Sequence, residues 1–422
     1  MKLNKRIVLP GVLALALAPL ACDFDVTNPG PVQSDFLLEP AAQPALVSGM
    51  GRGVAEALNW VAYTSAAVAR EIHPSGSTGS FGITGLQQKG TLREDEVNTQ
   101  WFNGQRARFL SESGIAIIED EGESEPGLLA QAYLWSGYAN RLMGENMCQA
   151  VIDGGSPQPS TEFLDRAEAA FRQAATLGSG DVQTAAQAGL ASVLAQQGRW
   201  SEVPSVASQV PTSFSYVVEY SNDFGDDTRN RLQFASAEQP YRAHTQWNTW
   251  VEGYGLSDDN PSGDPRVPYM LTNKTGDAAV ECCGQVDWWP QDKYPDPGAD
   301  VELSSGAEMR LLEAEAMLMD GDWQGAMAIV NDLRTAAGMP TETATSEAEA
   351  WGYYKREHAI EMWLEGRRLG ALRRWNDAGL TEDDLHPLEQ VSGDVATGSH
   401  LETRDYCFPI SESERQTNPN VS

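Results

Sequence analysis

The sequence predicts an all-α protein made of helix hairpins, with one long irregular insert. Three observations lead to this prediction. Apolar residues recur at steps of three and four over much of residues 42–210 and 305–377, which is the period of a helix with one buried face. A hairpin pattern near residue 189 recurs near residue 312. The helical period is lost over residues 211–304, which are rich in Gly, Pro, Asp and Trp.

Residues 1–21 have the pattern of a lipoprotein signal peptide. A basic start precedes an apolar run that is broken by prolines and is too short to span a hydrocarbon core of ~30 Å. The run ends at Cys22 after Pro19-Leu20-Ala21, a degenerate lipobox. We therefore predict that cleavage leaves a lipidated Cys22 followed by a proline-containing tether, residues 22–41. The alternative is an ordinary signal peptide that is cut near Ala21 and leaves the cysteine free.

The charge balance narrows the classes of partner. The chain has 60 Asp and Glu residues against 29 Lys and Arg, and its net charge is −31. An anion of this size repels phosphate backbones, so nonspecific binding to nucleic acid is excluded. The same repulsion disfavours binding flat on an anionic bilayer.

The N-terminal half of the body reads as packed helices. Residues 126–151 place Leu128, Ala132, Trp135 and Ala139 on one face, and residues 161–177 repeat the pattern with Phe163 and Phe171. We expect these two segments to form antiparallel neighbours, within a stretch from Ala42 to about Val210 that is almost wholly helical.

An internal repeat specifies the kind of hairpin. When residues 189–210 are aligned with residues 312–333, Gly198 matches Gly321 at the turn and Trp200 matches Trp323 just after it. This pattern resembles a tetratricopeptide helix pair, in which small residues let two helices approach and an aromatic ring fills the space after the turn. The offset is not a multiple of the repeat length of about 34 residues, so an insert separates the two pairs.

The insert, residues 211–304, carries the candidate site. Sugar binding needs flat apolar faces for the ring and planar polar groups for the hydroxyls. We assign the first role, as ligand-binding residues, to Trp247, Trp250, Tyr254, Trp288, Trp289 and Tyr294. The second role falls to Asn248, Asp287, Gln291 and Asp292. Trp101 and residues 75–82 form a second candidate edge. The competing interpretation is that these rings fill a small core of the insert itself.

The C-terminal part carries a family resemblance. Helical patterns run from Gly306 to Ala337 and from Ser346 to Asn376, and a loop segment, residues 378–422, ends the chain. The order of the Cys22 anchor, "DVTNP", "AEMRLLEAEAMLMDGDWQGAMAIVNDLRTAAGMP", "YYKREHAIEMWLEGRRLGALRRWND" and "FPISESERQTNPN" resembles the SusD/RagB family of outer-membrane lipoproteins. The resemblance covers nearly the whole mature chain, residues 22–422, of which residues 42–422 form the SusD-like domain.

This resemblance implies a protein without catalytic activity that faces the cell exterior. Such a protein captures an oligosaccharide or a peptide and delivers it to a SusC-like TonB-dependent transporter barrel in the outer membrane. A second hypothesis is a tetratricopeptide-like scaffold that only docks a protein partner. A third is an exported glycan hydrolase, but the sequence has no G-x-S-x-G elbow, no H-E-x-x-H motif and no P-loop.

Metal ligands, disulfides and the basic run are less specific. Cys148, Cys282, Cys283 and Cys407 allow three disulfide pairings that the sequence does not choose between. The alternatives are inert free thiols and, as the weakest, a zinc site, because no C-x-x-C occurs. The acidic runs, including Asp258, Asp259 and Asp264, lack the spacing of a calcium loop. We predict no cofactor and no metal. We expect the basic run to pair with nearby Glu361 and Glu365 as scaffold; its members are Arg367, Arg368, Arg373 and Arg374.

Overall fold

The computed structural model describes residues 38–421 except 224, 239–240 and 396–398. The signal peptide, the lipobox and Cys22 lie outside the described residues. Within the described part of the chain, no helix combines the length and the apolar character that crossing a membrane requires.

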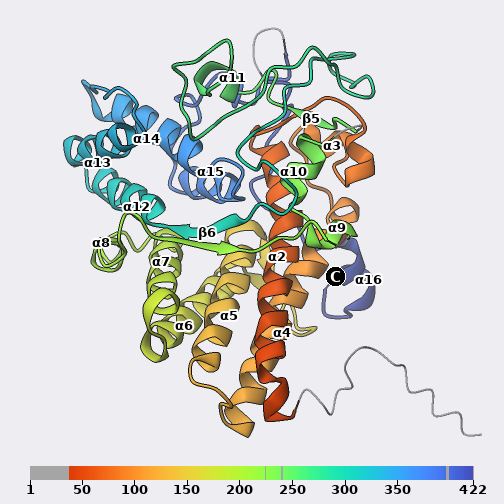
Figure 1. Cartoon of the computed structure of the whole chain (residues 1–422), viewed down its shortest axis with the longest axis vertical. Helices are drawn as coiled ribbons and strands as arrows, with labels where there is room; N and C mark the ends of the chain where they lie inside the picture. The colour runs from red at the N-terminus through yellow and green to blue at the C-terminus, as the bar shows by residue number, and fades with distance from the viewer. Residues whose placement is uncertain (1–37, 224, 239–240, 396–398, 422) are drawn as a thin grey trace, which may run out of the picture.

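Long helices build one half of the molecule, as predicted (Figure 1). Helix α2 runs through the centre and packs on α4, while α5, α6 and α7 follow one another as neighbours. The bounds are α2 (Gln43–Val68), α4 (Asn98–Glu121), α5 (Leu128–Asn146), α6 (Thr161–Leu177) and α7 (Gly180–Gln196). Close packing of α5 on α6 requires small residues, because a Cβ at Gly137 would lie 2.6 Å from the ring of Phe171.

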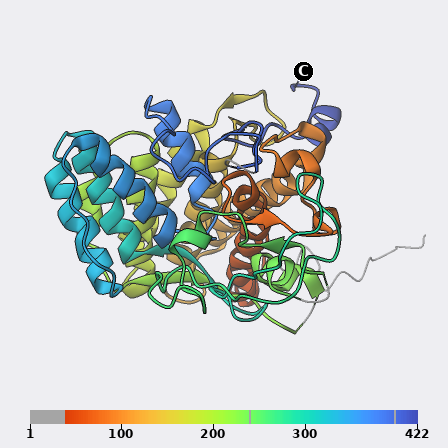
Figure 2. The ribbon, with the colours of Figure 1, turned by 90° about the horizontal axis from the view of Figure 1, so that it is seen from above.

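The second helical group lies beside the first in both views (Figure 1, Figure 2). Its apolar cluster joins the four helices α12 (Gly306–Met319), α13 (Trp323–Ala336), α14 (Glu347–Glu361) and α15 (Arg368–Asp377). The repeat turns are as predicted, with Gly198 at φ 71° and Gly321 at φ 84°, a conformation that favours glycine.

Three details of the helix prediction are wrong. The helix expected after Trp200 is only the short α8 (Val203–Ala207), and Pro204, which has no N–H, lies in its first turn, where proline is tolerated. The helix expected from Ser346 to Asn376 breaks between α14 and α15, where Leu364 and Gly366 have positive φ angles. The chain between α2 and α4 is mostly irregular, with β1 (His73–Pro74), η2 (Thr78–Phe81), α3 (Gly85–Gln88) and η3 (Glu94–Glu96).

The insert is irregular, as predicted, and a short antiparallel ladder closes its base. Strand β4 (Ser215–Val218) pairs with β6 (Val301–Ser305), with Ser215 opposite Ser305 and Val218 opposite Val301. This ladder brings the start and the end of the insert together below its loops (Figure 1). The other elements of the insert are short: α9 (Gly225–Thr228), α10 (Arg231–Ser236), β5 (His244–Thr245) and α11 (Val251–Tyr254). Elsewhere lie η1 (Pro40–Ala42), β2 (Gln149–Ala150), β3 (Gln158–Pro159) and α16 (Glu412–Thr417).

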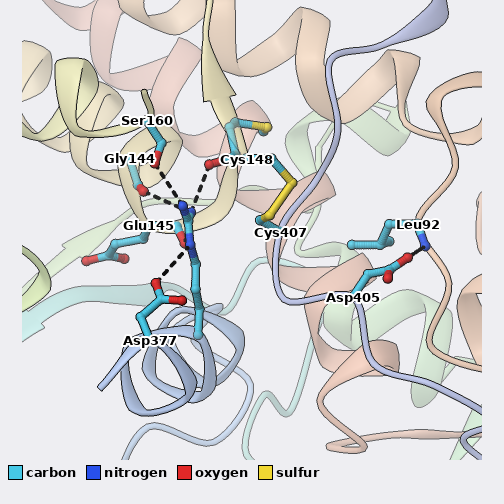
Figure 3. The surroundings of a disulfide bond; sticks show 10 residues. Leu92, Gly144, Glu145, Cys148, Ser160, Asp377, Asp405 and Cys407 are labelled. Carbon is cyan, nitrogen blue, oxygen red and sulfur yellow. Dashed lines mark hydrogen bonds and ion pairs between the residues drawn. A yellow bond between two sulfur atoms is a disulfide. The ribbon is translucent and has the colours of Figure 1, made fainter. Parts of the chain in front are cut away.

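The disulfides resolve the pairing that the sequence left open. Cys148, just after α5, is bonded to Cys407 in the C-terminal segment, across a sequence separation of 259 residues (Figure 3). Nearby, the carboxylate of Asp405 accepts a hydrogen bond of 2.7 Å from the backbone N–H of Leu92. The C-terminal segment is thus fixed to both the helical half and the loops before α4. The second disulfide joins the adjacent residues Cys282 and Cys283.

The basic run is scaffold, but the expected partners are wrong. Arg367 contacts Glu145 and Glu308, Arg368 contacts Glu389, and Arg374 contacts Glu315. Arg373 donates 2.8 Å to the carbonyl of Met147. The two expected partners bind cations of the insert instead: Glu361 lies 2.7 Å from Arg266, and Glu365 lies 2.6 Å from Lys293. Sequence spacing suggested local pairs, whereas the fold uses these arginines to tie distant segments together.

Candidate ligand-binding clefts

The structure divides the six predicted aromatic residues by burial. Trp250, Trp288 and Tyr294 are buried, whereas Trp247, Tyr254 and Trp289 are half-buried. The Trp288 Nε1–H donates 3.0 Å to the carbonyl of Ser236, and the Tyr294 hydroxyl donates 3.0 Å to the carbonyl of Leu364. These two rings are thus held inside the protein with their polar atoms satisfied, which is what the competing interpretation expects for them.

The predicted polar residues have different environments. Gln291 is buried and holds the backbone at Tyr294, since its Nε2 donates 3.1 Å to that carbonyl and its Oε1 accepts 2.9 Å from that N–H. Asn248 adopts φ 55° beside a bond of 2.9 Å from its backbone N–H to Glu252. Asp287 and Asp292 are exposed. Gln291 and the backbone of Asn248 therefore shape the loops of the insert.

Two of the predicted rings, Trp250 and Tyr254, line a cleft of about 330 Å³, here named the Tyr254 cleft. It lies between α11 of the insert, helix α14 and the segment that follows α15. The lining residues are Trp250, Tyr254, Glu349, Gly352, Tyr353, Arg356, Ala359, Arg368, Asp384, Leu385, His386, Pro387 and Glu389.

Aromatic rings and one guanidinium group are arranged together in this cleft. Arg356 lies over the rings of both Tyr254 and Tyr353, with its Cζ 5.6 and 5.1 Å from the two centroids. The His386 ring meets Tyr254 edge-on at 5.4 Å. An ion pair of 2.6 Å to Glu342 holds the position of Arg356. The guanidinium group thus packs against both tyrosine rings, and all three side chains line the cleft.

The polar groups of the Tyr254 cleft are held by neighbours. Asp384 accepts 2.7 Å from Lys355, and Glu389 is paired with Arg368. Burial lowers the pKa of His386, so this imidazole is neutral at pH 7. Its Nδ1 accepts 3.2 Å from the backbone N–H of Leu388, which leaves Nε2 as the protonated, donating nitrogen. The cleft therefore offers fixed acceptors and donors next to flat apolar faces.

A second hollow, here named the Trp247 hollow, lies beside the vicinal disulfide. It measures about 590 Å³ and joins a smaller cavity of about 200 Å³ through shared lining residues. Lys89 lies at the junction, 3.0 Å from Glu281 and 3.2 Å from Glu402. The shared lining residues are Lys89, Glu281, Cys282 and His400.

Two histidines adjoin the Trp247 hollow. The His73 ring meets Trp247 edge-on at 5.1 Å and His400 at 4.8 Å. Burial lowers the pKa of His73 well below its usual value and that of His400 to about 3, so both rings are neutral. Of the second edge suggested by the sequence, Gly76 and Thr78 line the smaller cavity, whereas Trp101 is buried.

Sequence reasoning missed Tyr353, Arg356 and His386 as site residues. The first two belong to α14, whose apolar and polar residues alternate without a clear stripe, and the third lies in the closing loop segment. Only the tertiary packing of these segments on the insert brings them to Tyr254. The neighbouring "YY" and "REH" letters within one helix were the only available signal, and they fit a structural role equally well.

The family comparison agrees with the resemblance seen in the sequence. The model of the SusD family matches residues 306–422, which include the three C-terminal motifs quoted above. A search of curated proteins finds no match.

Solved structures with the same fold cover nearly all of the chain. A SusD superfamily protein from Bacteroides vulgatus has a TM-score of 0.68 at 16% identity, over 91% of this chain and 98% of its own. A SusD-like carbohydrate binding protein from the same organism gives 0.65 at 14%, over 91% and 97%. Surface glycan-binding protein A from Bacteroides uniformis gives 0.62 at 13%, over 89% and 98%. Residues 306–422 thus match the model of the SusD family, and nearly the whole chain has a SusD-like fold.

Proposed function

We propose that this protein is a lipid-anchored binding protein of the cell surface that captures an oligosaccharide and delivers it to a TonB-dependent transporter barrel. We further propose that the ligand binds in the Tyr254 cleft. Two similar structures carry the names of carbohydrate- or glycan-binding proteins, which supports a sugar as the ligand class. The observation that carries the choice of site is the pair of tyrosine faces, Tyr254 and Tyr353, beside Arg356.

The chemistry of the cleft suits a sugar. The C–H face of a pyranose packs on a tyrosine ring, and each such contact adds on the order of 1 kcal/mol beyond burial. Asp384 and the neutral His386 supply an acceptor and a donor for hydroxyl groups. A volume of about 330 Å³ accommodates one or two sugar rings, so an oligosaccharide would bind by its end. We expect affinities in the micromolar to millimolar range, which suits a protein that releases its ligand to a transporter.

The carboxylates of the cleft favour binding over hydrolysis. Asp384 is held by Lys355 and Glu389 by Arg368, so both carboxylates are engaged in ion pairs. A glycosidase needs one carboxyl group that stays protonated as the general acid. Glu349, the third acid of the cleft, accepts 2.6 Å hydrogen bonds from both the backbone and the hydroxyl of Thr345 and is committed to capping α14.

Calorimetry on the mature chain, carrying Cys22→Ser to keep it free of lipid, tests the site. A panel of neutral oligosaccharides and peptides is titrated, and the best ligand is then tested against Tyr254→Ala and Tyr353→Ala. We expect each substitution to weaken binding by about tenfold or more, as the loss of a stacked ring predicts. Phe102→Ala is the matched control, because Phe102 is an exposed aromatic residue on α4 outside the cleft.

The outcomes separate the alternatives. Binding that is unchanged in both tyrosine variants but lost in Trp247→Ala would move the site to the Trp247 hollow. Peptide binding without sugar binding would reverse the ligand class, and release of shorter sugars would make the protein a hydrolase.

The lipid anchor is tested separately. We expect labelled palmitate to be incorporated into the wild-type chain and not into Cys22→Ser. Recovery of a large barrel protein with the wild-type chain from detergent extracts tests the proposed transporter partner.

A further inference from the structure

The Cys282–Cys283 disulfide lies against two histidines that come from distant parts of the chain. In the described residues, the one group of three potential metal ligands is His73, Cys282 and His400, whose ligand atoms all lie within 4.8 Å of one another. These three residues belong to β1, the insert and the C-terminal segment. Neither the sequence spacing nor the Tyr254 cleft accounts for this convergence.

His73 is oriented as a metal ligand would be. Its Nδ1 donates 2.6 Å to the carbonyl of Pro74, so the ring is held in the tautomer whose Nε2 carries a free lone pair. That Nε2 lies 4.0 Å from the Sγ of Cys283. Metal-binding histidines typically use one nitrogen for such a backbone contact, which fixes the ring and directs the other nitrogen at the metal.

His400 is the second independent observation. It is only 5% exposed, yet neither ring nitrogen forms a hydrogen bond with any residue that the structure describes. The carbonyl of Gln88 is near enough to raise the pKa of the ring, but it does not reach hydrogen-bond geometry. Buried polar groups in native proteins nearly always have a hydrogen-bond partner. A bound metal ion would explain why the ring nitrogens of His400 have none.

The site is reachable from solvent. Cys282 is exposed, and Cys282 and His400 both line the Trp247 hollow and the smaller cavity that joins it. The buried Arg70, which lowers the pKa of His73 and His400, repels a cation here. A weakly coordinated ion such as Ca²⁺ is therefore disfavoured, and binding requires strong bonds to nitrogen and a negatively charged sulfur.

We propose that His73, His400 and Cys282 form a site for Zn²⁺ or a similar borderline divalent cation, and that the disulfide to Cys283 closes it. Three protein ligands leave one position of a tetrahedral zinc ion open for water. The exposed disulfide is the kind that a dithiol reduces. In that step the dithiol gives two electrons and two protons, becomes a disulfide itself and leaves two thiols. Zinc then displaces one proton from the Cys282 thiol and bonds to the thiolate.

The test uses the full mature chain, carrying Cys22→Ser and no histidine tag. Zinc binding is measured by competition with a chromophoric chelator, before reduction and after anaerobic treatment with a dithiol that is then removed. We expect one zinc per reduced chain, bound at least about 100-fold more tightly than by the oxidised chain. Loss of a residue that only contacts a metal ligand already lowers affinity by up to about 100-fold, and the oxidised chain lacks the Cys282 thiolate ligand itself. With Co²⁺ as the probe, a sulfur-to-metal charge-transfer band should appear only after reduction.

Two cysteine variants make a matched pair. Cys283→Ser frees the Cys282 thiol permanently, so this variant should bind zinc without any reductant. Cys282→Ser removes the ligand itself and should not bind tightly in either state. Both side chains are on or near the surface, so neither change threatens folding. His400→Gln in the Cys283→Ser background should lose about 100-fold or more in affinity.

Three results would overturn the proposal. The first is equal zinc affinity in the Cys282→Ser and Cys283→Ser variants. The second is tight binding that persists in His400→Gln, which would mean that thiols bind the ion without this histidine. The third is absence of binding by Cys283→Ser when its circular dichroism spectrum matches that of the wild type. None of these results depends on whether the Tyr254 cleft binds sugar.

Discussion

Arg368 forms a buried, two-bond ion pair with Glu389, in which Nε lies 2.7 Å from Oε1 and Nη2 lies 2.9 Å from Oε2. The exposed fractions of the two side chains are 1% and 3%. The pair joins the start of α15 to the loop that follows it, and both residues line the Tyr254 cleft. This contact therefore connects the best-defined motif of the sequence, around "EGRRLGALRRW", to the proposed site.

Glu389→Ala should destabilise the protein strongly. The substitution leaves the Arg368 charge buried without its carboxylate, a change that typically costs about 3–5 kcal/mol. Chemical unfolding of the variant measures this loss. Asp95→Ala is the control, because the pair of Asp95 with Arg93 is half exposed and should contribute about 0–1 kcal/mol. Similar losses of unfolding free energy in both variants would show that the buried pair contributes no more to stability than the exposed one.

Glu389→Gln separates the effect on the site from the effect on folding. The amide keeps one acceptor for Arg368 and the volume of the side chain, so the loop should keep its position. We expect an intermediate loss of stability and sugar binding close to that of the wild type. Weak binding in a well-folded Glu389→Gln protein would instead mean that the carboxylate itself contacts the ligand.

The sequence predicted the helices and the turn glycines because these depend on local patterns. Gly198 and Gly321 end repeated apolar segments, and both have the positive φ that such a turn requires. The site was harder, because a Trp or Tyr ring looks the same in sequence whether it faces solvent or the core. Trp288 is buried, and its N–H donates to the Ser236 carbonyl, a contact across 52 residues that the sequence does not reveal.

The same reason explains the missed partners of the arginines. Sequence spacing reveals pairs within one helix, as between residues three or four apart. Arg367 instead reaches Glu145, 222 residues away, and Tyr254 meets His386 in the closing loop. Such contacts follow from how the two helical groups and the insert pack, which no local pattern encodes.

Gly366→Ala should be costly for two separate reasons. Gly366 has φ 71°, and a Cβ there would lie 2.8 Å from the Cβ of Ala62 and 3.1 Å from its Cα, on the central helix α2. The left-handed backbone angle costs a residue with a Cβ about 1–2 kcal/mol, and the clash with Ala62 adds to that cost. Gly379→Ala measures the cost of the backbone angle alone, because Gly379 has φ 74° and its added Cβ meets no described atom within 4 Å.

Thermal unfolding of the two alanine variants tests this account. We expect Gly366→Ala to lower the melting temperature clearly more than Gly379→Ala does. If the two variants have the same melting temperature, the added Cβ at residue 366 is accommodated against α2 at no cost in stability, and the glycine is needed only for its backbone angle.

Removal of the long-range disulfide should destabilise the chain, whereas removal of the vicinal one should not. The Cys148–Cys407 bond restrains an unfolded loop with a sequence separation of 259, so replacing both cysteines with serine should cost about 2–4 kcal/mol. The Cys282–Cys283 bond joins neighbours and restrains almost nothing in the unfolded chain. Urea unfolding of the two double-serine variants makes the comparison. A larger loss from the vicinal pair would contradict it.

Glu71→Gln should reduce the loss of stability that accompanies rising pH. Burial raises the pKa of Glu71 to about 7, while the unfolded value is 4.5, so the folded state holds a proton that the unfolded state has lost. The contribution of this proton is complete below pH 4.5 and is lost as the pH rises through 7. The glutamine keeps an oxygen to accept the 2.8 Å bond from the Leu364 N–H but has no proton to lose.

Unfolding free energies at pH 5 and pH 8 should therefore differ less in the variant than in the wild type. Some dependence should remain, because burial also raises the pKa of Glu365, to about 8. Equal pH dependence in the two proteins would mean that Glu71 is already ionised in the folded state at pH 5, stabilised by the nearby Arg368 and Lys293.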